Sequence, residues 1–121
     1  MRINIVTLFP EFFREPLRLS IPGRAAAAGL VEYRVVNLRD FGKGRYQAVD
    51  DYPYGGGAGM VLKPEPFFAA VESLAEPGSD RPAGKILLMS ARGKRFVHDD
   101  AVRLSLEPEL TFLCGHYKDV D

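Results

Sequence analysis

The chain has little of the chemistry that cysteine and histidine supply: among 121 residues there are one cysteine, Cys114, and two histidines. A single cysteine excludes an internal disulfide and is typical of proteins kept in a reducing cytoplasm. A structural zinc site needs clustered cysteine and histidine ligands, and no such cluster is present. We therefore expect no metal site in these residues, and we interpret Cys114 as a small apolar residue at a strand end rather than a nucleophile.

Long hydrophobic runs are also missing. No apolar stretch approaches the roughly 18 residues that a membrane-spanning helix requires. The apolar run 3–8 is followed by Arg14 and Arg18 and has no small-residue cleavage site after it, which argues against a signal peptide. These features predict a cytoplasmic protein that does not bind a membrane.

Net charge is absent as well, because 16 basic residues balance 16 acidic ones. A neutral chain has no bulk attraction to nucleic acid, but the charge is unevenly distributed. Residues 1–45 carry eight Lys or Arg against four acids, and a basic surface built from Arg24, Arg39, Lys43 and Arg45 could hold a phosphate backbone. An ordinary solvated face, with Arg39 paired to Asp40, is the alternative.

Periodicity predicts an α/β fold. Strands are expected at 3–8, 31–36, 86–89 and 110–114, and helices after Pro10, at 24–28, from Lys63 to Leu74, and at 99–104. Pro22-Gly23 is expected to separate the first two helices, and the uniformly apolar run 86–89 to be covered on both faces. This alternation gives a mainly parallel sheet with helices on both faces.

Ligands of such sheets bind beyond the carboxyl ends of the strands. Three segments rich in glycine, polar or aromatic residues emerge there: a long loop that includes residues 50–60, the turn 90–93, and residues 115–118. His116 lies in the last of these, and we interpret it as a bystander. The sequence therefore predicts that the ligand-binding site lies where these three segments meet.

The glycine-rich segment, residues 50–60, is the strongest single signal. It reads Asp-Asp-Tyr-Pro-Tyr-Gly-Gly-Gly-Ala-Gly-Met, with four glycines within five residues. Glycine is clustered where the backbone needs unusual dihedrals or a close approach to a ligand, so we favour a substrate-gripping loop over a flexible surface loop. A stand-alone nucleotide- or phosphate-binding module is an alternative, although the Gly-Lys-Ser/Thr ending of a P-loop is missing. A catalytically inactive RNA-binding or dimerisation domain is another.

Four segments together resemble the bacterial tRNA (guanine-N1)-methyltransferases, which methylate the guanine at tRNA position 37. They are Ile5-Val6-Thr7-Leu8-Phe9-Pro10-Glu11-Phe12-Phe13, Asn37-Leu38-Arg39-Asp40-Phe41, residues 49–62, and Cys114-Gly115-His116-Tyr117. The resemblance extends along the whole chain in order. It implies that residues 1–121 are the N-terminal part of a SPOUT-type domain. The rest of that domain, with its trefoil knot, and a small C-terminal RNA-binding domain would follow.

The same resemblance implies S-adenosylmethionine as the methyl donor, homodimers, and binding of the tRNA anticodon stem-loop. Residues implied for the cofactor pocket are Leu88, Met89, Ser90, Ala91, Gly115 and Tyr117. Residues expected to face the tRNA are Asp50, Tyr54, Gly57 and Gly59, with Arg24 and Arg39 as phosphate contacts. The catalytic base and a conserved arginine are expected beyond Asp121, so residues 1–121 alone should be inactive.

The chain departs from the commonest family pattern at three places. Ala91 and Ala58 stand where proline is usual, which leaves both turns less rigid. Lys118-Asp119 replaces the usual Glu-Gly, and that glutamate is linked in the family to magnesium dependence. A magnesium role in the whole enzyme therefore cannot be assigned to this position.

Overall fold

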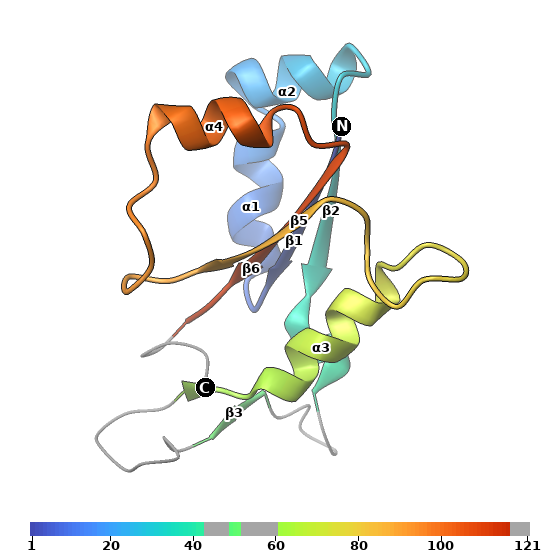
Figure 1. Ribbon diagram of the computed structural model, residues 1–121, viewed down its shortest axis with the longest axis vertical. Coiled ribbons are helices and arrows are strands. Elements are labelled where there is room, and N and C mark those ends of the chain that lie inside the picture. Colours follow the sequence, from blue (N-terminus) through green and yellow to red (C-terminus); the bar gives the residue numbers. More distant parts are fainter. Residues whose placement is uncertain (43–48, 52–60, 117–121) are drawn as a thin grey trace.

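The computed structural model describes residues 1–42, 49–51 and 61–116, and Figure 1 shows their arrangement. The elements in chain order are β1 (Arg2–Thr7), α1 (Pro10–Leu17), α2 (Ser20–Ala27), β2 (Glu32–Asn37), the 3₁₀ helix η1 (Leu38–Phe41), β3 (Asp50–Asp51), β4 (Val61–Leu62), α3 (Pro64–Ser73), β5 (Lys85–Met89), α4 (His98–Leu104) and β6 (Glu109–Cys114).

Four parallel strands form the main sheet in the order β2-β1-β6-β5. The two-residue strands β3 and β4 pair separately in the antiparallel sense. Arg14 and Leu17 of α1 border a cavity with Tyr33 and Val35, whereas α3 packs in the core cluster that contains Val36. Because adjacent strand residues point to opposite faces, α1 and α3 cover opposite faces of the sheet. The predicted α/β class, with a mainly parallel sheet and helices on both faces, is confirmed.

The apolar core lies between α3 and the carboxyl half of the sheet. Leu38 and Leu62 are fully buried, and Phe67 of α3 packs with them against Val6 of β1. Phe68, the next residue of α3, is exposed. Leu38 belongs to η1, so the long loop predicted after β2 begins with an ordered 3₁₀ turn, in which the Asn37 Oδ1 atom accepts a hydrogen bond from the Arg39 N–H (3.0 Å). The core therefore fixes the start of that loop.

Helix α2 begins earlier than predicted and includes Pro22 and Gly23. Its first backbone bond runs from the Gly23 N–H to the Leu19 carbonyl (3.1 Å), so Pro22 occupies a first-turn position whose N–H would have no helical partner. A β-carbon on Gly23 would lie 2.2 Å from the Arg18 carbonyl oxygen, so only glycine fits there. Gly29 follows the helix with φ of +75°, the left-handed conformation in which glycine commonly ends a helix.

Strand β5 forms one edge of the described sheet. Its apolar side chains are exposed, contrary to the expectation that both faces of this strand are covered. Ile86, Leu88 and Met89 expose 38%, 52% and 47% of their surface. In the described ranges, no strand pairs with the outer side of β5. The apolar run 86–89 is expected to be buried, but residues 1–42, 49–51 and 61–116 do not bury it by themselves.

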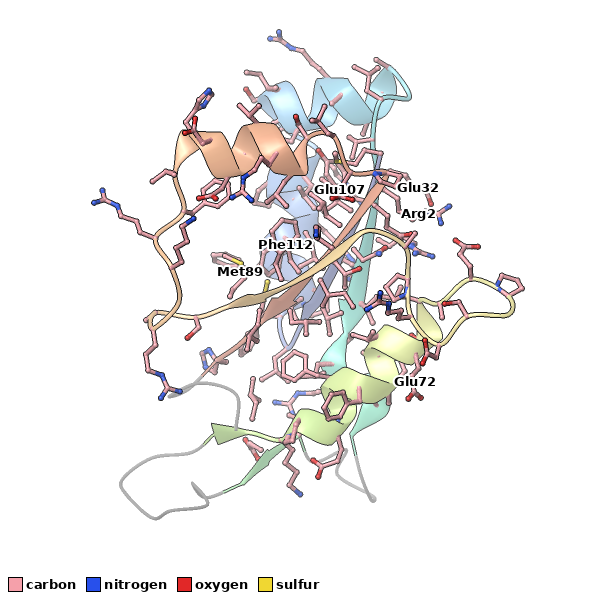
Figure 2. All side chains as sticks on the ribbon, in the orientation of Figure 1. Arg2, Glu32, Glu72, Met89, Glu107 and Phe112 are labelled. Atoms are coloured by element: carbon pink, nitrogen blue, oxygen red, sulfur yellow. The ribbon has the colours of Figure 1, made fainter. Side chains whose placement is uncertain are left out.

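At the amino ends of the strands the sheet surface becomes polar. Arg2 of β1 forms ion pairs with Glu32 of β2 (3.6 Å) and with Glu76 (3.3 Å), and Figure 2 shows Arg2 and Glu32 side by side. None of the described helices has the length and apolar character needed to cross a membrane. The carboxyl ends of the strands, which carry the candidate site, are at the other end of the sheet.

Candidate functional site

The carboxyl ends of β1, β6 and β5 lie side by side and position the candidate site. Met89 of β5 is the register partner of Cys114 of β6, so the residues that follow, Ser90 and Gly115, leave neighbouring strands at the same edge. The chain passes from β1 to β2 on one side, while β6 and β5 lie on the other, so the strand order reverses between β1 and β6. Such a reversal point is where open parallel sheets hold their ligands.

Ser90 organises the turn that follows β5. Its carbonyl accepts a hydrogen bond from the Gly93 N–H (3.3 Å), and its Oγ atom accepts one from the Arg92 N–H (3.1 Å). The side-chain bond is the local mechanism by which serine stabilises turns. It holds the exposed Ala91 at the tip, next to the end of β6. Four of the residues implied for the cofactor pocket (Leu88, Met89, Ser90, Ala91) therefore lie together, with Gly115 on the adjacent strand end.

A cavity of about 290 Å³ opens between the ends of β1 and β6, lined by Thr7, Phe9, Phe12, Phe13, Cys114, Gly115 and His116. The Phe9 and His116 rings meet edge to face with centroids 5.0 Å apart. The Phe9 N–H donates to the Thr7 Oγ1 atom (3.1 Å), which fixes the exit of β1.

Sequence reasoning missed the phenylalanines of this cavity and took His116 for a bystander. A usable signal was present, because Phe9-Pro10 directly follows a strand end, where parallel sheets place ligand-binding residues.

Cys114 lies at the end of β6, partly buried. Burial raises the pKa of its thiol above the ordinary value, because the charged thiolate is poorly solvated there. The protonated thiol is a weak nucleophile, in agreement with its interpretation as an apolar filler.

Asp50 lies in β3, opposite Leu62 of β4. The Lys63 N–H donates to the Val49 carbonyl (2.7 Å), and both Val49 and Leu62 are buried in the core. The core therefore anchors both flanks of the glycine-rich segment. Its members Tyr54, Gly57 and Gly59, together with Tyr117 of the implied cofactor pocket, lie outside the described residues.

The two arginines expected to contact phosphates lie far apart. Arg39 belongs to η1, directly after the carboxyl end of β2, whereas Arg24 belongs to α2, beside the amino end of the sheet (Figure 1). Arg24 and Arg39 therefore do not share one basic surface, and of these two Arg39 lies at the edge that carries the site. The other two residues of the predicted surface, Lys43 and Arg45, lie outside the described residues. In the part of the chain that the structure describes, Arg39 forms no ion pair with Asp40.

The described residues include no group of three or more His, Cys, Asp or Glu side chains that could hold a metal ion. The described site consists of a turn held by Ser90 and a small cavity lined by aromatic residues. Both features suit an organic ligand with an aromatic ring.

Comparison with known proteins agrees with this geometry. The family described as tRNA (Guanine-1)-methyltransferase TrmD matches residues 1–121. Curated proteins named tRNA (guanine-N(1)-)-methyltransferase match the whole chain, with 46% identity in Chlorobaculum tepidum, 48% in Dictyoglomus turgidum and 46% in Bacillus subtilis. The crystal structure of tRNA (m1G37) methyltransferase from Aquifex aeolicus superimposes with a TM-score of 0.87 at 32% identity, covering all of this chain and 53% of that one.

The shared region is the same in each comparison. The chain spans about half the length of the curated relatives that it matches, between 47% and 51% for these three. Because the family match extends from the first residue to the last, the chain belongs to the tRNA (Guanine-1)-methyltransferase family.

Proposed function

We propose that the protein containing these residues transfers a methyl group from S-adenosylmethionine to N1 of guanine 37 of tRNA, beside the anticodon. One structural observation carries the proposal: the Ser90 turn and Gly115 leave the neighbouring strands β5 and β6 at the same edge, and β6 borders the point where the strand order reverses. Membership of the family, whose relatives are named for this reaction, supports it.

The residues present fit such a cofactor. Leu88, Met89, Ser90 and Ala91 would line one side of the pocket, and Gly115 and Tyr117 the other. The Ser90 hydrogen bonds hold the turn in one shape before the ligand arrives, which reduces the entropy cost of binding. S-adenosylmethionine supplies the methyl group when it is bound.

On the substrate side, Asp50, Tyr54, Gly57 and Gly59 would face the guanine and its neighbours, with Arg39 at the same edge. Arg24 would have to contact a more distant part of the tRNA, because α2 lies beside the amino end of the sheet. Direct methyl transfer requires an in-line approach of N1 and removal of its proton. Positioning alone can lower such a barrier by roughly 7–11 kcal/mol. We place the proton-accepting base and a conserved arginine in the part of the enzyme that follows residue 121.

The proposal extends to the assembly. Residues 1–121 would form the N-terminal part of a SPOUT domain, completed by a segment that forms a trefoil knot and followed by a small RNA-binding domain. The enzyme would act in the cytoplasm as a homodimer on the anticodon stem-loop. Magnesium could assist the whole enzyme, but no described residue is assigned to it.

Calorimetry and methyl transfer with the full-length protein test the proposal. Ser90→Ala removes the acceptor of the Arg92 N–H, and Ser79→Ala is a matched control because the Ser79 Oγ atom accepts from the Arg81 N–H in a remote connector. We expect Ser90→Ala to weaken S-adenosylmethionine binding about three- to tenfold, the worth of one hydrogen bond, and Ser79→Ala to leave it unchanged.

Labelled methyl groups should appear in tRNA with guanine 37 and not in a transcript with adenine 37. Residues 1–121 alone should show no turnover. Binding of a nucleoside triphosphate in place of S-adenosylmethionine would contradict the proposal and favour a nucleotide-binding module. Full turnover by residues 1–121 would contradict the assignment of the base to the remainder of the enzyme.

A further inference from the structure

The connection between β5 and α4 carries a concentration of positive charge that the proposed cofactor site does not use. Residues 92–96 contain Arg92, Lys94 and Arg95 and no acidic residue, and all five residues are exposed. They follow the Ser90 turn directly, at the carboxyl end of β5. The charged connection therefore begins at the edge that carries the candidate site and runs back along β5 to α4, so that Lys94 and Phe96 lie in one cavity with Lys85 (Figure 1).

Several of the described arginines form ion pairs within the protein. Arg2, Arg14, Arg18, Arg34 and Arg103 each form an ion pair with a carboxylate. Arg95 forms neither an ion pair nor a hydrogen bond through its side chain with any described residue. Lys94 has only a 3.7 Å contact with Asp100, and that carboxylate is also bonded to the Val97 N–H and to Arg103. The connection therefore retains a net positive charge.

A cavity of about 360 Å³ is lined by residues of this connection, of β5 and of α4. Its lining includes three cationic side chains, Lys85, Lys94 and Arg103, against the single carboxylate of Asp100. Phe96 borders the same cavity and exposes 61% of its surface. An exposed aromatic ring among cations is the combination that binds the backbone and an unstacked base of single-stranded nucleic acid.

We propose that Lys85, Arg92, Lys94 and Arg95, with Phe96 between them, form a docking surface for the phosphate backbone of the substrate RNA. This inference rests on the proposed function and names a further RNA contact for it. The anionic partner of a tRNA-modifying enzyme is a polyphosphate chain, and a cluster of exposed cations complements it. Because the connection begins at the Ser90 turn, RNA bound along it extends towards the edge of the sheet that carries the proposed cofactor pocket.

The experiment uses the full-length protein and two variants with the same change in net charge. Lys94→Gln/Arg95→Gln removes two cations of the surface, and Arg18→Gln/Arg81→Gln removes two exposed cations elsewhere. The Kd for unmodified tRNA is measured by filter binding at several salt concentrations, with the Kd for S-adenosylmethionine and kcat at saturating tRNA as readouts of the site.

We expect Lys94→Gln/Arg95→Gln to weaken tRNA binding on the order of tenfold at about 0.1 M salt and to reduce the salt slope by about one to two. Binding of S-adenosylmethionine and kcat should change less than about twofold. Phe96→Leu should weaken tRNA binding with an unchanged slope, because stacking releases no counterion. The control variant should match the wild type.

Equal losses in both double variants would overturn the proposal, since bulk charge would then explain them. So would an unchanged tRNA affinity and slope in Lys94→Gln/Arg95→Gln while the wild type methylates guanine 37; that result leaves the proposed function intact. Loss of binding to phosphatidylserine vesicles, with tRNA binding retained, would also overturn it. If the wild type neither binds nor methylates tRNA, the proposed function and this inference fail together.

Discussion

Gly84 and Glu109 are in backbone contact where β5 and β6 begin. A β-carbon built on Gly84 would lie 1.8 Å from the Glu109 carbonyl oxygen, and Gly84 has φ of +74°. The next residue, Lys85, pairs with Leu110 and opens the β5–β6 ladder. This glycine therefore satisfies two demands at once, a left-handed dihedral and a close approach of two chains.

Gly84→Ala should destabilise the protein by more than the strain of its left-handed backbone dihedral alone, because the added β-carbon also clashes with Glu109. Gly29→Ala is the matched control, because Gly29 has φ of +75° and no atom within 4 Å of an added β-carbon. We expect Gly29→Ala to cost about 1–2 kcal/mol of unfolding free energy and Gly84→Ala clearly more. Urea unfolding of the full-length variants measures both. Equal losses of unfolding free energy in the two variants would show that the backbone at Gly84 can shift and relieve the clash with no further loss of stability.

A second prediction concerns a buried polar network across β2, β1 and β6. Arg34 donates to the Asn4 Oδ1 atom (2.7 Å) and forms an ion pair with Glu109 (2.9 Å), while the Asn4 Nδ2 atom donates to Glu109 (2.6 Å) and Thr111 (3.0 Å). Asn4 and Thr111 are fully buried, and Glu109 nearly so. Removing Arg34 leaves the buried carboxylate of Glu109 without its cationic partner, which lowers the unfolding free energy.

Arg34→Met should therefore cost about 2–3 kcal/mol of unfolding free energy, less than for a fully buried pair because Arg34 is partly exposed. Arg14→Met is the control, since its pair with Glu11 is exposed (3.5 Å), and it should cost about 0.5 kcal/mol or less. Chemical denaturation gives both values. A loss in Arg34→Met no larger than in the control would mean that solvent reaches Glu109.

The third prediction is a pH dependence at Asp100. The pKa of this carboxyl is lowered, chiefly by the hydrogen bond from the Val97 N–H at the start of α4, with Lys94 and Arg103 adding to the effect. A lowered folded-state pKa means that the ionised form stabilises the fold above the ordinary pKa of 3.8. This stabilisation is lost as the pH falls through the folded-state pKa.

Asp100→Asn should accordingly be less stable than the wild type near neutral pH, and the difference should shrink as the pH is lowered below 3.8. Asp99→Asn, an exposed neighbour in the same helical turn, is the control and should show a smaller difference. Unfolding free energies across the acidic range test this. A difference that grows on acidification would contradict the assignment.

The sequence was sufficient for the features that depend on local patterns. The four strands of the main sheet, Pro10 at the start of α1 and Gly29 after α2 follow from propensity and capping, whereas the short strands β3 and β4 were not predicted. The parallel order of the sheet follows from the alternation of strands and helices. Such patterns also located Ser90 and Gly115 at one edge, because strand ends of a parallel sheet meet there.

The remaining features depend on the three-dimensional arrangement of the chain rather than on local sequence patterns. The clash that fixes Gly23 in α2 is with Arg18, and no local rule for Pro-Gly predicts it. The exposure of Met89 could not be inferred, because an apolar run shows that burial is needed but not which segment provides it. Arg24 and Arg39 were grouped by charge, yet the fold places them at opposite ends of β2.

A last prediction tests the role of Cys114. Burial raises the pKa of its thiol above 9.0, so the thiolate fraction near neutral pH should be smaller than that of a free cysteine. Iodoacetamide should label the native protein slowly near neutral pH and faster as the pH rises above 9.0.

Cys114→Ala should reduce methyl transfer by no more than about tenfold, since removal of a true covalent nucleophile costs on the order of 10⁶-fold. The small loss has a structural origin, because Cys114 lines the aromatic cavity beside Phe9 and Gly115. Cys114→Ser keeps the size of the side chain and should lie between the alanine variant and the wild type. Rapid labelling near neutral pH, together with a loss of several orders of magnitude in Cys114→Ala, would instead identify a reactive thiolate at the end of β6.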